Sequence, residues 1–177
     1  MMLFSRLFRK KRARAKGRWL YELALSASRY KEFYVKGAVP DTVDGRFDLL
    51  VIHVWLLIRR LNALEVQPLG QDVFDAMFVD MDNALRELGI SDTALGKRIK
   101  DMAKVFYGRA EVYNTALDEG DDKALGTALV RNVFENVERA SGHGADLARH
   151  MQRIEHSLAE QSLESLLKNG PCYPPFA

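Results

Sequence analysis

The segment 45–61 reads "GRFDLLVIHVWLLIRRL", and it decides the fold of this chain. On a helix, its apolar side chains cover almost the whole circumference, which is typical of a helix in the centre of a bundle or inside a membrane. One face holds Phe47, Leu50, Val51, Val54, Ile58 and Leu61, and most of the rest is covered by Leu49, Ile52, Trp55, Leu56 and Leu57. A membrane span needs about 20 apolar residues, but only ten uncharged residues, His53 among them, separate Asp48 from Arg59. We therefore predict the central core helix of a soluble bundle.

The rest of the sequence also favours helices over strands. No stretch alternates apolar and polar residues over the length of a strand, and proline occurs only at positions 40, 68, 171, 174 and 175. Gly89 is a typical helix end, and Ser91 and Asp92 are typical N-caps. The predicted helices span residues 19–36, 44–64, 71–88, 92–117, 122–139 and 145–168. The fold class is all-α, a single-domain bundle of about six helices at 19–168, with a basic leader at 1–18 and an irregular tail at 169–177.

Length and composition agree with one soluble domain. The chain has 177 residues, enough for one domain with a real core, and 47% hydrophobic with 28% charged residues is ordinary for a globular protein. Its only cysteine is Cys172. That excludes an internal disulfide and a multi-thiolate metal site, and it indicates a reducing compartment.

The leader has a charge of its own. Residues 1–18 carry eight basic groups and no acid, whereas the rest of the chain holds 18 basic and 24 acidic groups. Four apolar residues at helical spacing, Leu3, Phe4, Leu7 and Phe8, precede the basic run. The leader therefore predicts a contact with a membrane surface or with RNA. The basic contact residues would be Arg6, Arg9, Lys10, Lys11, Arg12 and Arg14.

Two other interpretations of the leader stay open. It is Arg-rich and acid-poor like an organellar presequence, although it is short and its only hydroxyl residue is Ser5. A solubilising tail has the same composition. No apolar run follows it, so it is not predicted to be a secretory signal.

Three aspartates, Asp75, Asp80 and Asp82, raise the question of a metal or acid/base site. On a helix they point away from the apolar stripe that begins at Phe74, and no Glu-x-x-His pair of the di-iron type is present. We therefore expect them on a solvated or partner-facing side.

The histidines are the second candidates for chemistry. His143, Asp146 and His150 share roughly one helix face, a spacing that could bind a metal, but His143 lies in a glycine-flanked break. His53 is expected to be a hydrogen-bonded core residue, and Cys172, in a proline-rich tail, is a poor nucleophile. We predict no catalytic residue, no metal site and no cofactor.

Aromatic and basic residues suggest binding surfaces instead. Tyrosine is favoured at interfaces because its ring is apolar and its hydroxyl polar. Tyr21, Tyr34 and Tyr107 are the candidates, with partly exposed packing as the equally open alternative. Basic residues of the segment 92–117, Lys97 among them, lie off its apolar stripe and form either a solvated face or an interaction surface.

Two stretches carry a resemblance to a known family. They are "VPDTVDGRFDLLVIHVWLLIRRL" (39–61) and "FDAMFVDMDNALRELGISDTALGKRIKDMAKVFYGR" (74–109). Both resemble the ubiquinol–cytochrome c chaperone family, the assembly factors of the respiratory cytochrome bc complex, over about residues 19–140. The motif residues carried over as structural supports or partner contacts are Asp44, Gly45, Arg46, Asp80, Asp82, Gly96, Lys97, Tyr107, Gly108 and Arg109.

The resemblance implies an all-helical chaperone that is not an enzyme. Family members bind newly made cytochrome b and aid its insertion or haem loading; in mitochondria they work with a small partner chaperone and can sit at the ribosome. The short chain resembles a bacterial member acting at the cytoplasmic side of the inner membrane, with the mitochondrial matrix side as the alternative. DNA is not an expected partner.

Two further functions remain as alternatives. One is a ribosome- or RNA-associated helical module that acts through the cationic leader, for which RNA binding would fall steeply with salt. The other is a helical enzyme with an Asp or His metal site.

Overall fold

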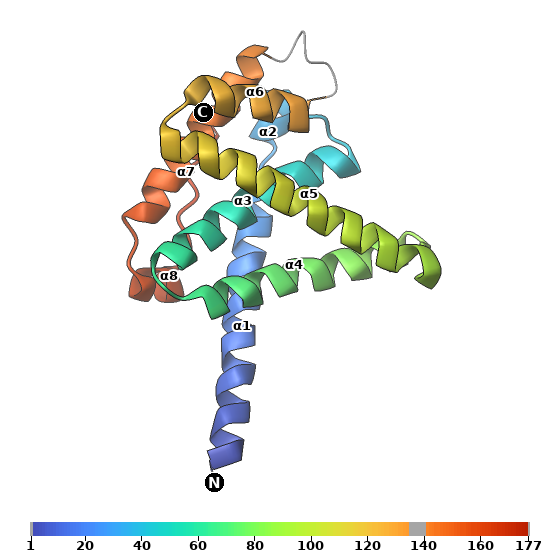
Figure 1. The fold of residues 1–177 in the computed structure, drawn as a ribbon, viewed down its shortest axis with the longest axis vertical. Helices are drawn as coiled ribbons and strands as arrows, with labels where there is room; N and C mark the ends of the chain where they lie inside the picture. Colours follow the sequence, from blue (N-terminus) through green and yellow to red (C-terminus); the bar gives the residue numbers. More distant parts are fainter. Residues whose placement is uncertain (1, 135–140, 177) are drawn as a thin grey trace.

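The computed structural model describes residues 2–134 and 141–176, with the backbone alone for residues 2–13 and for residue 141. This part of the chain contains eight α-helices and no strand, which confirms the all-α prediction (Figure 1). The helices are α1 (Met2–Ser28), α2 (Glu32–Val35), α3 (Val43–Ala63), α4 (Gln67–Glu87), α5 (Asp92–Glu119), α6 (Asp122–Val133), α7 (Ser141–Ala159) and α8 (Leu163–Asn169). Over the same residues, no helix has both the length and the apolar character needed to cross a bilayer.

The helix α3 lies at the centre, as predicted from its apolar circumference. It packs against α1, α4, α6 and α7, and every residue from Asp48 to Leu57 is buried. The imidazole of His53 is 1% exposed, and its Nδ1 lies 2.7 Å from the carbonyl oxygen of Leu49. The expectation of a hydrogen-bonded core histidine is confirmed.

The prediction of one continuous helix over 19–36 is wrong. The helix α1 ends at Ser28, whose hydroxyl donates to the carbonyl of Leu25 at 2.8 Å, and a turn leads into the short α2. This break turns Phe33 into the core, where its ring centre lies 5.4 Å from that of His53. Burial of one large aromatic side chain therefore decides a break that helical propensity alone does not predict.

The basic leader continues into the bundle as one helix. Residue 18, the predicted end of the leader, lies inside α1. Near it, α1 crosses α4 so closely that a Cβ on Gly17 would lie 2.5 Å from the Cβ of Asp72. The ammonium of Lys16 donates to the carbonyl of Leu167 in α8 at 2.9 Å. Residues 14–18 thus support the fold, while the division into leader, domain and tail stays a prediction.

The helices α4 and α5 form a long hairpin through the turn at Gly89. Pro68 does not follow α3 as a breaker but sits in the first turn of α4, where proline is favoured because its missing N–H has no helical partner there. The predicted start at residue 71 is therefore four residues late. Gly89 adopts φ +79, a left-handed conformation that L residues rarely take, and it ends α4 as expected.

The C-terminal part departs most from the predicted boundaries. The expected helix 122–139 ends at Val133, and residues 135–140 lie outside the described part of the chain. The expected helix 145–168 is two helices, because the Ser162 hydroxyl caps α8 by accepting from the backbone N–H of Ser165 at 3.2 Å. The irregular tail is packed against the core: Phe176 is 4% exposed, and the Tyr173 hydroxyl donates to the carbonyl of His53 at 3.1 Å.

Candidate functional site

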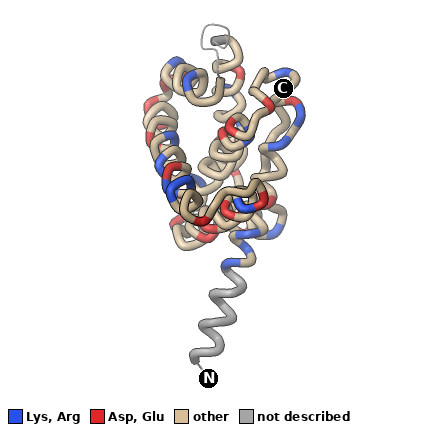
Figure 2. Tube along the Cα trace, turned by 90° about the vertical axis from the view of Figure 1, so that its right-hand side faces the viewer, with Lys and Arg blue, Asp and Glu red and all other residues tan. Residues whose placement is uncertain are grey.

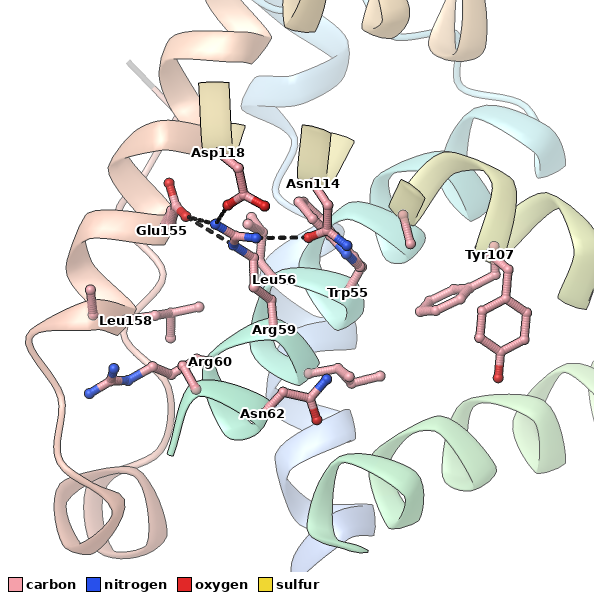
Figure 3. A pocket seen from close by; sticks show the side chains of 15 residues that line it. Trp55, Leu56, Arg59, Arg60, Asn62, Tyr107, Asn114, Asp118, Glu155 and Leu158 are labelled. Carbon is pink, nitrogen blue, oxygen red and sulfur yellow. Dashed lines mark hydrogen bonds and ion pairs between the residues drawn. The ribbon is translucent and has the colours of Figure 1, made fainter. Parts of the chain in front are cut away.

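A cleft of about 640 Å³ opens between α3, α5 and α7, and we call it the arginine cleft (Figure 3). Its walls combine apolar and aromatic side chains with two arginines that follow the apolar run of α3. The lining includes Trp55, Arg59, Arg60, Phe106, Tyr107 and Leu158.

Arg59 is held by three acceptors across this cleft. Its Nε donates to Glu155 at 3.0 Å, its Nη1 to Asn114 at 2.9 Å and its Nη2 to Asp118 at 2.6 Å. Burial acts to lower the pKa of Arg59, but its hydrogen bonds to Asp118 and Glu155 outweigh that effect and raise the pKa. Figure 3 shows these partners converging on one guanidinium, which ties α3 to α5 and α7. Arg59 therefore shapes the cleft and has little donor capacity left for a ligand.

Arg60, by contrast, binds the segment that follows α7. Its Nη2 donates to the carbonyl of Gln161 at 2.6 Å, but its Nε is buried without a partner among the described atoms. Tyr107, on α5, lies at the other end of the cleft and is 58% exposed. An apolar floor with an exposed aromatic rim suits a protein segment better than a reacting small molecule.

A second cleft, of about 520 Å³, lies between the start of α3, α5 and α6, and we call it the aspartate cleft. Asp48, 6% exposed, pairs there with Arg109, whose Nη2 also donates to the carbonyl of Asn132 at 3.2 Å. Burial raises the pKa of Asp48 to about 6, although the nearby Arg109 opposes that rise. The buried ion pair therefore fixes α5 against α3 and α6.

The Asp-Gly-Arg motif forms the entrance to α3. The Thr42 hydroxyl caps the helix by accepting from the N–H of Gly45 at 3.1 Å. A Cβ on Gly45 would lie 2.1 Å from the carbonyl oxygen of Pro40, so no larger residue fits this turn. Arg46 pairs at the surface with Asp41 at 2.7 Å, and Asp44, in the first turn, suits the positive end of the helix dipole. The motif is thus a structural turn whose charged side chains remain exposed.

The predicted partner-contact residues fall into two groups. Tyr21 is wrong as a surface residue: it is fully buried, and its hydroxyl donates to Asp80 at 2.6 Å. Asp80 also lies 3.6 Å from Arg18, so the expected free carboxylate joins α4 to α1 instead. Arg109 likewise points inward to Asp48. Each of these polar groups is drawn inward by a partner from a distant part of the sequence.

The other predicted contacts remain accessible. Tyr34 and Asp82 are partly buried, and Asp82 accepts from Arg86 at 2.7 Å. The remaining contacts, Asp44, Arg46, Lys97 and Tyr107, are exposed. The structure does not bring these residues into one patch, because Asp44 lines the aspartate cleft whereas Tyr107 lines the arginine cleft.

The leader residues are only partly described. Arg14 lines a groove with Asp72 and Asp75 of α4. The side chains of Arg6, Arg9, Lys10, Lys11 and Arg12 lie outside the described residues.

The candidate metal ligands do not assemble into a site. In residues 14–134 and 142–176, no three His, Cys, Asp or Glu side chains lie close enough together to hold a metal ion. His150 instead packs in the core, with its ring centre 6.2 Å from that of His53. Burial lowers the pKa of His150 to about 3 and that of His53 to about 4, so both rings are neutral at pH 7.

A known protein family matches most of this chain. The family model described as ubiquinol-cytochrome C chaperone matches residues 36–173, from the end of α2 to the packed tail. The chain belongs to this family. The match begins 17 residues later than the range 19–140 expected from the motifs and ends 33 residues further on, because the C-terminal helices and the tail are also part of it. The family is one of assembly chaperones and not of catalytic enzymes.

A solved relative matches the chain almost from end to end. The crystal structure of the Cbp3 homolog from Brucella abortus is 36% identical, with a TM-score of 0.84, and the match covers 99% of this chain and 98% of that one. The ubiquinol-cytochrome-c reductase complex assembly factor 1 of Xenopus laevis is 27% identical over 65% of this chain and 58% of its own length. The human protein of that name is 24% identical over 85% of this chain and 51% of its own length. The chain thus spans a little over half the length of these two assembly factors.

Proposed function

We propose that this protein is an assembly chaperone of ubiquinol–cytochrome c reductase that binds newly made cytochrome b. The family match over residues 36–173 carries the proposal, and relatives named as assembly factors of that complex support it. Binding would aid the insertion of cytochrome b into the membrane or its loading with haem. The proposed location is the cytoplasmic side of a bacterial inner membrane, with the mitochondrial matrix side as the alternative; a small partner chaperone remains part of the proposal.

The arginine cleft is the surface we propose for cytochrome b. A membrane subunit that has not yet been assembled exposes apolar segments, and a chaperone must offer them apolar area that its own fold leaves uncovered. Ala63, Ala159 and Tyr107 are exposed on the cleft walls and Ile58 is partly exposed, whereas Trp55, Phe106 and Leu158 form the closed apolar floor.

Deleting the gene and complementing the deletion with variants tests both the proposed function and the proposed cleft. The deletion should lower the amounts of cytochrome b and of the assembled complex, and the wild-type gene should restore them. Tyr107→Asp should fail to restore them, because it places a charge at the rim of the apolar cleft. Tyr30→Asp is the matched control, since Tyr30 is also an exposed tyrosine, at 41%, but lies outside the cleft.

The possible results separate the function from the surface. Normal levels of cytochrome b and of the complex in the deletion strain would overturn the function. A different result is that the deletion lowers these levels and Tyr107→Asp then restores them as fully as Tyr30→Asp. That result would overturn the choice of cleft and leave the function standing.

A second candidate function rests on the charge of the leader. Eight basic groups without an acid in residues 1–18 favour a ribosome- or RNA-associated module. Its test is RNA binding that falls steeply with salt and is lost when residues 2–13 are deleted. That deletion spares residues 14–18, which pack against α4 and α8. Binding that is absent, or independent of salt, would reject this function.

A further inference from the structure

The turn between α4 and α5 exposes two aliphatic side chains at one extremity of the molecule. Leu88 is 66% exposed and Ile90 is 36% exposed, on either side of Gly89. Figure 1 shows this turn at the far right, away from the rest of the bundle. A single exposed leucine needs no explanation. Two exposed aliphatic residues on either side of a projecting turn indicate a contact surface when a charged face lies beside them.

The second feature is a row of lysines that begins one turn into α5. Lys97, Lys100 and Lys104 follow one another at spacings of three and four residues, so they share one side of the helix, and Tyr107 continues the same row. All four are exposed. Figure 2, seen from the end that carries the turn, shows the basic positions gathered on this part of α5.

The charge of this surface is mostly uncompensated. Among the described residues, Lys97 and Lys100 form no ion pair, and Lys104 lies 3.7 Å from Asp101. Two acids flank the turn, Glu87 and Asp92, but Arg86 pairs with Asp92. A net positive helix face thus adjoins an apolar tip.

We propose that the α4–α5 end of the molecule is a contact surface for an anionic lipid bilayer. Leu88 and Ile90 enter the boundary between headgroups and acyl chains, and the three lysines contact lipid phosphates. Lys104 lies seven residues after Lys97, or about 10 Å along the helix axis, so one bilayer surface can meet all three charges. Tyr107 suits the same boundary, because its ring is apolar and its hydroxyl polar.

Lipid fits this surface better than nucleic acid. Phosphates of RNA would also attract the lysines, but they offer nothing to two exposed aliphatic side chains. A bilayer interface takes up both features, and each basic residue near an anionic membrane adds to its attraction. Tyr107 lies on both surfaces, but this proposal rests on Leu88, Ile90 and the three lysines, so it does not depend on the binding of cytochrome b, and it concerns a different element from the leader.

A fluorophore at position 88 tests the insertion directly. In the full chain with Cys172→Ser, Leu88→Cys carries an environment-sensitive dye, and Val35→Cys, at a residue 79% exposed on α2, is the control. On vesicles of phosphatidylcholine and phosphatidylglycerol, the emission of the dye at position 88 should shift to the blue while that at position 35 stays unchanged. A shift at neither position, or the same shift at both, would overturn the proposal. Contact through the leader alone would leave position 88 in water.

Charge variants test the lysine row. Lys97→Gln, Lys100→Gln and Lys104→Gln together should weaken binding to these vesicles on the order of 100-fold. The control replaces three exposed lysines elsewhere, Lys31, Lys36 and Lys123, and should have much less effect at the same loss of net charge. If both triple variants lost the same amount of vesicle binding, net charge alone would explain the effect, and the proposal would be overturned. So would a selective loss of RNA binding with vesicle binding unchanged.

Discussion

The buried ion pair of the aspartate cleft gives the sharpest prediction about the fold. Arg109→Met removes the guanidinium but keeps most of the side-chain volume, so that Asp48, 6% exposed, loses its cationic partner. Removing one member of a buried ion pair costs about 3–5 kcal/mol, because a buried charge is left uncompensated. We expect a loss of that size in the free energy of unfolding, measured by urea denaturation at pH 8.

The pH dependence of this loss in stability shows whether the uncompensated charge of Asp48 causes it. Burial already raises the pKa of Asp48 to about 6 in the wild type, and without Arg109 that pKa rises further. As the pH falls from 8 towards 6, the carboxyl of the variant protonates while that of the wild type stays ionised. The deficit of the variant should therefore shrink by about 1.4 kcal/mol for each pH unit between the two pKa values and be smallest below pH 6. Comparing variant and wild type at each pH cancels the contributions of the buried histidines.

Two further variants complete this test. Arg98→Met, at an exposed arginine that lines the same cleft, should change the free energy of unfolding by no more than about 0.5 kcal/mol. Asp48→Asn combined with Arg109→Met should recover part of the loss, because the buried charge is gone. A deficit below about 1 kcal/mol for Arg109→Met, or one that is constant between pH 8 and pH 5, would refute the reasoning.

Three more predictions concern stability, each measured by urea denaturation. Tyr21→Phe should cost about 1–2 kcal/mol, because Asp80 loses a hydrogen bond at 2.6 Å; no loss would mean that this bond adds nothing. Gly17→Ala should cost about 1–3 kcal/mol, because its Cβ would meet Asp72 at 2.5 Å, and an unchanged stability would contradict the close helix crossing. His150 is buried and neutral, with its pKa lowered to about 3, so its contribution is present above pH 6.5 and is lost as the pH falls. His150→Phe should therefore remove about 3 kcal/mol of the stability lost between pH 6.5 and pH 4, and an unchanged pH dependence would count against it.

Periodicity predicted the centre of this fold well. An apolar circumference over 45–61 requires burial on all sides, and α3 is indeed enclosed by α1, α4, α6 and α7. The breaks after α1 and α7 could not be predicted in the same way. One depends on Phe33 packing against His53. The other combines the Ser162 cap of α8 with Gln161, which binds the backbone of Gly170 and Cys172 in the tail. Both are contacts between residues far apart in the sequence or in an irregular segment.

The same limit applies to the candidate site. Helical spacing placed Tyr21 and Tyr107 equally well on a surface, yet the first is buried and the second exposed. What separates them is the position of Asp80, 59 residues from Tyr21 in sequence. Asp48 and Arg59 escaped attention as site residues, although a signal was present: both are charges that border the apolar run of the central helix.

Capture of the partner in living cells tests the central claim most directly. A photo-crosslinking amino acid in place of Tyr107, at the rim of the arginine cleft, should give a product that contains cytochrome b, identified by mass spectrometry. The same probe at Tyr30 should give little or none of it. Efficient capture of other proteins at position 107, without cytochrome b, would contradict the proposal that this chaperone binds cytochrome b through the arginine cleft.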